Sequence, residues 1–324
     1  MTDAISEISV VIPNWDGLRW LPGCLQSLAR QDRPADEVIV VDNGSTDGSL
    51  EYLRGEYPQV RVIALSTNTG FAHAANRGLV AARGDAIALV NTDVELAADW
   101  IARMAAALEG DPGFGSVACK MLSLADPTSI YDAGDVLRRD GACEQRGRFA
   151  RDDGRWDEPG EVFGACAGAA LYRRDAVLGV GGFDERYFAY LEDVDLALRL
   201  RLAGWRCLYE PAVALHAGEG SSHRLPGRHH YLVERNTLIL VAKAFPPRWL
   251  PLVAYRQLGW AWHAARERRL GVQVRAAAAA VPLLPRTLRE RRRLRRTARV
   301  PIETVVPALP ITGPAAGGHP SQHA

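Results

Sequence analysis

Two hydrophobic periodicities alternate through the first hundred residues, and this alternation constrains the fold more than any other feature. Short runs rich in valine and isoleucine, typical of strands covered on both faces, occupy residues 8–12, 38–41, 60–65 and 86–90. Helical spacing separates them, most clearly between Phe71 and Ala82, where apolar residues form one continuous stripe. The repeated order of strand and helix predicts an α/β fold, with a mostly parallel sheet covered by helices on both faces.

Polar segments follow all four predicted strands. They read PNWD (13–16), DNGS (42–45), NTG (68–70) and NTD (91–93). Because ligands of open parallel sheets bind beyond the carboxyl ends of the strands, we expect these segments to share one edge. Each segment alone is also ordinary turn and helix-cap chemistry, but their joint placement favours a site with Asp42 and Asp93 nearest the ligand.

The sequence excludes two common nucleotide-binding designs. No G-x-G-x-x-G follows the first strand, and no G-x-x-x-x-G-K-[ST] occurs in the chain. Two carboxylates at strand ends, without a phosphate-binding lysine, indicate instead a divalent cation that bridges protein and diphosphate. Mg²⁺ uses one or two carboxylates together with phosphate oxygens and waters in this way.

A second acidic group follows a small, glycine-rich stretch. Aliphatic residues at helical spacing from Val194 predict a helix that stops at Gly204, which puts three acids in its first turn: Glu192, Asp193 and Asp195. Acids in this position are also ordinary, since the helix dipole stabilises each by roughly 0.3 to 1 kcal/mol. Asp195 can in addition pair with Arg199. The residues alone therefore leave structural and catalytic roles open.

Charge divides the chain unevenly, although the formal net charge is only +1. Residues 264–324 hold twelve arginines against three glutamates, so an acidic body is joined to a basic end. We predict a domain over 1–225, a helical, arginine-rich region over 226–299, and a disordered tail over 300–324. The arginine run has three interpretations: a solvated helical face, a nucleic-acid patch, or an arm on an anionic membrane. The tryptophans precede the arginine run instead of interleaving with it, which argues against single-stranded nucleic acid. We expect Arg286–Arg299 to contact an anionic membrane surface, at about 1 kcal/mol per arginine.

Cysteine spacing and hydropathy indicate the compartment. The five cysteines are scattered and form no CxxC pair, so neither a disulfide framework nor a familiar zinc site is expected. The N-terminal residues lack a basic leader, and no apolar stretch reaches the ~20 residues that span a bilayer. We predict a cytoplasmic protein, peripheral on the inner face of the cytoplasmic membrane.

Seven features occur in a fixed order over roughly residues 8–240. They are SVVIPNWDG (9–17), VVDNGSTDGS (40–49), NTGFAHAANRG (68–78), LVNTDVEL (89–96), GGFDERYFAYLEDVDLALRLRLAGW (181–205), His216 and Arg235-Asn236. Together they resemble the inverting glycosyltransferases of family 2, which have the GT-A nucleotide-sugar fold, and especially the bacterial rhamnosyltransferase-like branch.

The resemblance implies roles for individual residues. Trp15 and Asp42 would hold the nucleobase and ribose of a UDP- or dTDP-sugar. The metal motif falls on residues 91–93, where Asp93 is the charged ligand of Mg²⁺ or Mn²⁺ and His216 completes the site. Asp193 would be the catalytic base, with Glu192 as the alternative. The full donor-binding set is Pro13, Trp15, Asp42, Asn68, Gly70, Asn91 and Asp93.

The implied reaction is a single displacement that moves a sugar, rhamnose in the branch resembled, to a saccharide or lipid-linked acceptor of an envelope polysaccharide. Two alternatives remain at this point. A nucleotidyltransferase also uses a doubly wound sheet and Mg²⁺, but its glycine-rich, arginine-bearing first loop is absent. A non-catalytic sugar-nucleotide sensor or scaffold is the other, and the acids at Asp93 and Asp193 argue against it.

Overall fold

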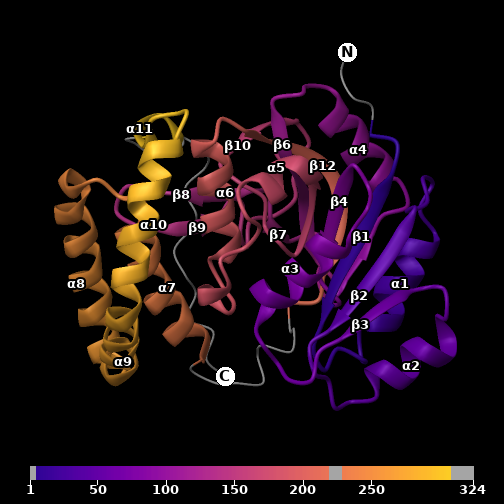
Figure 1. Cartoon of the computed structure of the whole chain (residues 1–324), viewed down its shortest axis with the longest axis horizontal. Coiled ribbons are helices and arrows are strands. Elements are labelled where there is room, and N and C mark those ends of the chain that lie inside the picture. Colours follow the sequence, from indigo (N-terminus) through magenta and orange to yellow (C-terminus); the bar gives the residue numbers. More distant parts are fainter. Residues whose placement is uncertain (1–4, 219–227, 308–324) are drawn as a thin grey trace.

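The structure, a computed structural model, describes residues 5–218 and 228–307. Its centre is a ten-stranded sheet in the order β10-β12-β6-β11-β4-β1-β2-β3, with β5 paired to β12 and β7 to β6 (Figure 1). Four strands of the N-terminal half pair in parallel: β1 (Ile8–Asn14), β2 (Glu37–Asp42), β3 (Arg61–Ala64) and β4 (Ala86–Val90). They are connected through helices α1 (Leu21–Ala29), α2 (Ser49–Glu56) and α3 (Phe71–Ala81). The α/β prediction for this half is confirmed.

The second half of the sheet mixes directions. Strand β11 (Ala169–Arg173) runs antiparallel between β4 and β6 (Phe114–Ser123), and β12 (Arg206–His216) lies parallel to β6. Short strands complete it: β5 (Val94–Leu96), β7 (Ile130–Asp132) and β10 (Gly160–Val162). A separate small hairpin pairs β8 (Asp135–Leu137) with β9 (Cys143–Gln145).

Apolar side chains cover both faces of the sheet. Along β1, Val10 and Ile12 belong to one buried cluster and Val11 to the other, as the two-residue period of a strand requires. Helices α1 and α4 (Trp100–Glu109) cover the first face. Helices α3, α5 (Arg174–Gly179) and α6 (Glu192–Leu202) cover the second. This double covering explains why the strands are apolar without alternation.

The C-terminal region is helical, as predicted, and stands beside α6 (Figure 1). It consists of α7 (Arg228–Ala244), α8 (Leu250–Arg266), α9 (Leu270–Ala280), α10 (Leu284–Thr297) and α11 (Ile302–Val305). The boundary predicted at 225/226 lies outside the described residues. Of the described helices, none is at once long enough and apolar enough to cross a bilayer.

The segment predicted as a disordered tail begins differently from our expectation. Residues 302–305 form α11, because Val305 and Val306 are buried in an apolar cluster with side chains of α6 and α7. Residues 308–324, the rest of the predicted tail, lie outside the described residues.

Candidate functional site

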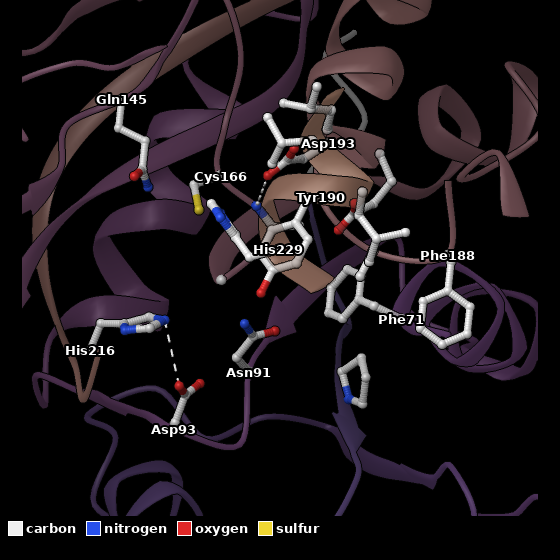
Figure 2. Close-up of a pocket in the computed structure, with 18 of the residues that line it drawn as sticks. Phe71, Asn91, Asp93, Gln145, Cys166, Phe188, Tyr190, Asp193, His216 and His229 are labelled. Atoms are coloured by element: carbon white, nitrogen blue, oxygen red, sulfur yellow. Dashed lines mark hydrogen bonds and ion pairs between the residues drawn. The ribbon is translucent and has the colours of Figure 1, made fainter. Parts of the chain in front are cut away.

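A cavity of about 620 Å³ opens at the carboxyl ends of the parallel strands. The loop after β4 and the end of β12 form one side, with Asn91, Asp93 and His216, and the start of α6, with Asp193, forms the other (Figure 2). Eight of the predicted site residues line it: Pro13, Trp15, Asn68, Asn91, Asp93, Glu192, Asp193 and His216. The fold thus brings together segments that lie far apart in the sequence.

Two predicted donor-binding residues lie behind the cavity wall. Asp42 is fully buried, and its carboxylate accepts hydrogen bonds from Asn14 Nδ2 at 2.8 Å and from the backbone N–H of Ser45 at 3.1 Å. Gly70 has φ +94°, and a Cβ there would come within 2.7 Å of Phe188, a cavity residue. In this arrangement Asp42 and Gly70 shape the wall, and the direct donor contact predicted for them stays a prediction.

Strand pairing assembles one end of the cavity. Asp93 lies between β4 and β5, and β5 pairs with the end of β12, so the side chain of His216 faces Asp93. Nε2 of His216 lies 3.7 Å from Oδ2 of Asp93 (Figure 2). The backbone N–H of Gly218 donates to Nδ1 of His216 at 2.8 Å. Because Nδ1 accepts this bond, the neutral imidazole carries its proton on Nε2, which then has no lone pair for a metal.

An arginine and a tyrosine stack beside this histidine. The ring of Tyr131 lies parallel to the His216 ring, with centroids 3.9 Å apart and an interplanar angle of 16°. The guanidinium carbon of Arg148 lies 3.7 Å from the centroid of the Tyr131 ring. Both residues line the cavity, so the stack orients the imidazole and places a fixed cation beside the Asp93 end. The sequence analysis missed both residues, because nothing in their local pattern distinguishes them from loop residues.

The oxygen donors at this end suit a partly protein-bound cation. Among the described residues, no group of three or more His, Cys, Asp and Glu side chains is arranged to hold a metal. Asp93 offers a carboxylate, and Oδ1 of Asn91 is buried without a hydrogen-bond partner in the described structure. One carboxylate and one amide oxygen fit Mg²⁺ or Mn²⁺ if the remaining ligands are phosphate oxygens and waters. They do not form a closed protein site.

Four carboxyl groups gather at the other end of the cavity. Asp193 accepts hydrogen bonds from the backbone N–H groups of Ala167 at 3.2 Å and Val194 at 2.8 Å. Glu192 and Asp135 also line the cavity, and each has one buried oxygen without a partner in the described structure. Asp132, at the end of β7, is the fourth.

Burial raises the pKa of every member of this acidic cluster, Asp132, Asp135, Glu192 and Asp193. For Glu192 and Asp135, burial is followed by repulsion from Asp193, and both pKa values lie well above the usual range. Burial and Asp193 also raise the pKa of Asp132, to about 7. Burial also raises the pKa of Asp193 itself, although its backbone hydrogen bonds act to lower that pKa. Carboxyl groups that lie together and have raised pKa values are typical of acid–base sites.

The sequence analysis missed Asp132 and Asp135. They flank Gly134, whose φ of +103° permits the tight turn that aims both acids inward. The available signal was the spacing of two acids around a glycine in YDAGD (131–135), which gains meaning only when the fold brings it against α6.

A strained loop presents the acids of α6. Phe188, Tyr190 and Leu191 have φ values of 64°, 69° and 65°, a conformation that costs such residues about 1–3 kcal/mol each. The side-chain amide of Asn236, fully buried in α7, donates to the carbonyls of Tyr187, Ala189 and Tyr190 at 2.7–3.0 Å. The motif Arg235-Asn236 therefore has a positioning role that its sequence did not reveal.

Asp195 belongs to a different environment. It is fully buried and accepts hydrogen bonds from Lys243 Nζ at 2.5 Å, Arg199 Nε at 2.7 Å and the Tyr187 hydroxyl at 3.2 Å. Burial alone would raise the pKa of Asp195, but Lys243 and Arg199 outweigh it and hold the pKa below the usual value. Of the three acids in the first turn, this one is structural.

Comparisons with known proteins agree with this architecture. The family model described as "Glycosyl transferase family 2" matches residues 9–180. An N-acetylglucosaminyl-diphospho-decaprenol L-rhamnosyltransferase of Mycobacterium tuberculosis is 32% identical over 274 residues, which cover 77% of this chain and 87% of that protein.

Two solved structures share the fold at low sequence identity. TarS of S. aureus in complex with UDP-GlcNAc matches with a TM-score of 0.56 and 18% identity, covering 90% of this chain and 84% of that chain. The mannosyltransferase PcManGT of Pyrobaculum calidifontis, in complex with GDP-Man and Mn²⁺, matches with a TM-score of 0.51 and 19% identity, covering 92% and 89%. The predicted fold class is confirmed.

Proposed function

Because the chain belongs to glycosyltransferase family 2, and is therefore a glycosyltransferase, we propose that it moves a sugar with inversion from a UDP- or dTDP-sugar to a saccharide or lipid-linked acceptor. One observation carries this proposal. Asp93 and Asp193 are one hundred residues apart in the sequence, yet they line a single cavity. The cavity therefore offers a diphosphate end and an acid–base end to the same bound donor.

The Asp93 end would hold the diphosphate. Asp93 and the amide oxygen of Asn91 are the residues that would hold Mg²⁺ or Mn²⁺, and such an ion neutralises charge that develops on a leaving diphosphate. His216 was predicted as a further metal ligand, but its protonated Nε2 suits a donor role toward Asp93 or a phosphate oxygen. Arg148, which also lines the cavity, would add a positive charge to that of the metal ion at this end.

The acidic cluster would activate the acceptor. Asp193 takes the proton of the acceptor hydroxyl, the hydroxyl oxygen attacks the anomeric carbon from the face opposite the diphosphate, and the nucleoside diphosphate leaves. Backbone donors from Ala167 and Val194 keep Asp193 the most easily ionised member that faces the cavity. Burial and the charge of Asp193 raise the pKa values of Glu192 and Asp135 well above the usual range, and in their protonated form these groups would donate hydrogen bonds to sugar hydroxyls.

The donor and acceptor are further parts of the proposal. Trp15, in the loop that follows β1, lines the cavity, and its aromatic face can stack there on a pyrimidine. The similar M. tuberculosis protein is named a rhamnosyltransferase of a lipid-linked N-acetylglucosaminyl diphosphate. By extension we propose rhamnose as the sugar, a lipid-linked acceptor of envelope polysaccharide synthesis, and a cytoplasmic enzyme peripheral to the inner face of the membrane. Arg286–Arg299 were predicted to make that membrane contact.

A thermal-shift screen of nucleotide sugars with Mn²⁺ tests the donor, since a ligand that binds only the folded protein raises its apparent stability. We expect a pyrimidine nucleotide sugar to raise the melting temperature and its purine counterpart to leave it unchanged. The selected donor should release nucleoside diphosphate, and the product should show inverted anomeric configuration by NMR. Release of pyrophosphate, retention of configuration, or stabilisation by purine sugars alone would contradict the proposal.

A further inference from the structure

Helix α8 presents its apolar side chains to the outside. Val253 is its one buried residue among seventeen. Tyr255, Leu258 and Trp262, spaced i, i+3 and i+7, form one stripe and are 82%, 70% and 64% exposed. Leu252 extends this stripe by one turn and is also exposed. A surface helix of a water-soluble protein normally buries its apolar stripe and exposes its polar side chains. Something apolar should therefore cover this face of α8.

Exposed apolar residues are concentrated in this part of the molecule. The described residues include twelve large hydrophobic side chains that are exposed, and ten of them lie between Leu250 and Leu288. The other two, Val80 and Phe149, are isolated on the glycosyltransferase domain. Scattered single residues need no explanation, whereas a concentration of this kind marks a binding surface.

The charge of the same region selects the partner. Residues 250–299 contain thirteen arginines and two glutamates, with no lysine or aspartate. A second copy of the chain would bring these cations against each other, while an anionic lipid surface would neutralise them. The guanidinium carbons of Arg256 and Arg266 lie 5.3 and 4.7 Å from the ring centroids of Trp260 and Trp262. Aromatic rings and long cationic side chains in one place are typical of the bilayer interface.

We propose that the outer face of α8, formed by Leu252, Tyr255, Leu258 and Trp262, inserts into the headgroup region of an anionic lipid bilayer. This inference deepens the membrane contact of the proposed function and rests on it. Helix α10, which holds most of the arginines predicted to contact the membrane, would then attract the lipid without entering it. Arg291 donates to the carbonyls of Ala242 and Phe245, and Glu290 pairs with Arg186, so one side of α10 binds the protein. Its other arginines attract the lipid from outside, while α8 enters it.

Helix α7 connects this face to the cavity. His229, Leu232 and Val233 of α7 line the cavity. Directly after them, Glu234 and Leu238 line a groove of about 400 Å³ between α7, α8 and α9, to which Leu258 also contributes. A bilayer at α8 would therefore lie one helix away from the site of transfer, as an acceptor anchored by a lipid requires.

Cosedimentation of the full chain with vesicles tests the proposal. We expect binding to phosphatidylcholine vesicles that contain phosphatidylglycerol, weak binding to phosphatidylcholine alone, and quenching of tryptophan fluorescence by brominated acyl chains. The triple variant Tyr255→Ser, Leu258→Ser, Trp262→Ser should bind at least ten-fold more weakly. Because these side chains are exposed, the variant should keep its melting temperature. Val80→Ser, on an exposed apolar residue of α3, is the matched control and should bind like the wild type.

A second variant separates insertion from attraction. This triple variant of α10 carries Arg289→Gln, Arg292→Gln and Arg296→Gln. It should lose the salt-sensitive part of vesicle binding but keep the tryptophan quenching at saturating lipid. The proposal is overturned if the α8 variant binds and is quenched like the wild type. It is equally overturned if the wild type forms a dimer that the α8 variant abolishes, since a second copy would then cover the face. Transfer to a water-soluble acceptor should be unchanged in both variants. If the wild type itself shows no transfer, the proposed function is contradicted, whereas the lipid contact is judged by the vesicle binding alone.

Discussion

The two sides of helix α6 carry the same kind of residue in opposite electrostatic environments. Asp193 and Asp195 are two positions apart, which turns them about 200° around the helix. Asp193 faces the cavity among three other carboxyl groups, and among the described residues no ion pair to it is found. Asp195 faces the C-terminal helices and is paired with Lys243 and Arg199. Both residues are aspartates, so the residue type does not decide their roles. The nearby cations do: the aspartate with cationic partners stabilises the fold, and the one without them is available for catalysis.

The largest expected effect is the loss of transfer in Asp193→Asn. If Asp193 is the base, removal of its charge should lower kcat by about 10²- to 10⁴-fold, because a positioned base contributes that much. Asparagine keeps the shape, although its single amide oxygen can accept only one of the two hydrogen bonds that Ala167 and Val194 donate to separate carboxylate oxygens. Steady-state kinetics measure the loss, and titration calorimetry should show unchanged binding of the nucleoside diphosphate.

The matched control is Asp195→Asn on the other side of the helix. It should unfold more easily, while the folded protein should keep kcat within a few-fold of the wild type. If Asp193→Asn retains transfer within a few-fold, or if Asp195→Asn proves the more damaging to kcat, the assignment of the two sides is wrong.

The second effect concerns stability, in Lys243→Met. This change leaves Asp184 and Asp195 buried without their shared cation, and breaking a buried pair in this way costs about 3–5 kcal/mol. Both carboxyl groups have pKa values below the usual range, Asp195 through Lys243 and Arg199, and Asp184 through Arg186 and Lys243. The stability they contribute is present above about pH 4 and is lost as the pH falls. Urea unfolding should therefore show a larger deficit at pH 8 than at pH 2.

An exposed ion pair provides the control for Lys243. Arg248 pairs with Glu303 at the surface, and Arg248→Met should leave the unfolding free energy unchanged within error. A deficit for Lys243→Met as small as that of Arg248→Met would mean that the packed side of α6 does not depend on its cations.

The sequence predicted the cavity side better than the packed side, for a physical reason. Strand ends follow from local periodicity and from a general rule of open sheets, so Asn91 and Asp93 could be placed on one edge in advance. The role of the first turn of α6 came from the family resemblance and not from this rule. The pairing of Asp195 with Arg199, four residues on, was predicted and is confirmed. Its other cation, Lys243, is 48 residues away on α7, and only tertiary packing selects it. Asp132 and Asp135 were not predicted for the same reason. Their turn contributes to the acidic cluster only because tertiary packing places it against α6. Asp42 is fully buried in the described structure, and a strand end alone does not reveal whether a side chain points into the cavity or behind the wall.

The third prediction divides the cavity itself. Asp93→Ala should weaken Mn²⁺-dependent binding of a nucleoside diphosphate by at least ten-fold, because one carboxylate and one amide oxygen are the protein ligands that the described structure offers. Binding without a metal should change little. Titration calorimetry with and without Mn²⁺ measures the difference, and equal losses in the two conditions would remove Asp93 from the metal site.

His216→Gln sharpens the same test. Glutamine can replace a hydrogen-bond donor but not an imidazole ligand, so Mn²⁺ dependence should survive this change. Long-range ¹⁵N NMR of the wild type should show the proton on Nε2. A proton on Nδ1, or a loss of Mn²⁺ dependence as large as that of Asp93→Ala, would restore His216 as a ligand.

The smallest effect concerns what the acidic cluster costs the fold, and Asp132→Asn measures it. The pKa of Asp132 is raised to about 7, chiefly by burial, so the folded protein favours the protonated group. A raised pKa contributes stability that is present in acid and is lost as the pH climbs from about 4 through 7. A neutral asparagine, which can still accept the hydrogen bond from the backbone N–H of Gly134, should therefore stabilise the protein at pH 8 by about 1 kcal/mol and much less at pH 4. The gain is modest because the remaining carboxyl groups redistribute the shared proton.

Asp126, whose pKa is lowered by hydrogen bonds from Thr128, gives the opposite sign, since Asp126→Asn removes a contribution that exists only above acid pH. Unfolding measured across this range decides the matter: a destabilised Asp132→Asn at pH 8 would mean that the cluster holds the fold together, and the contrast between the two sides of α6 would disappear.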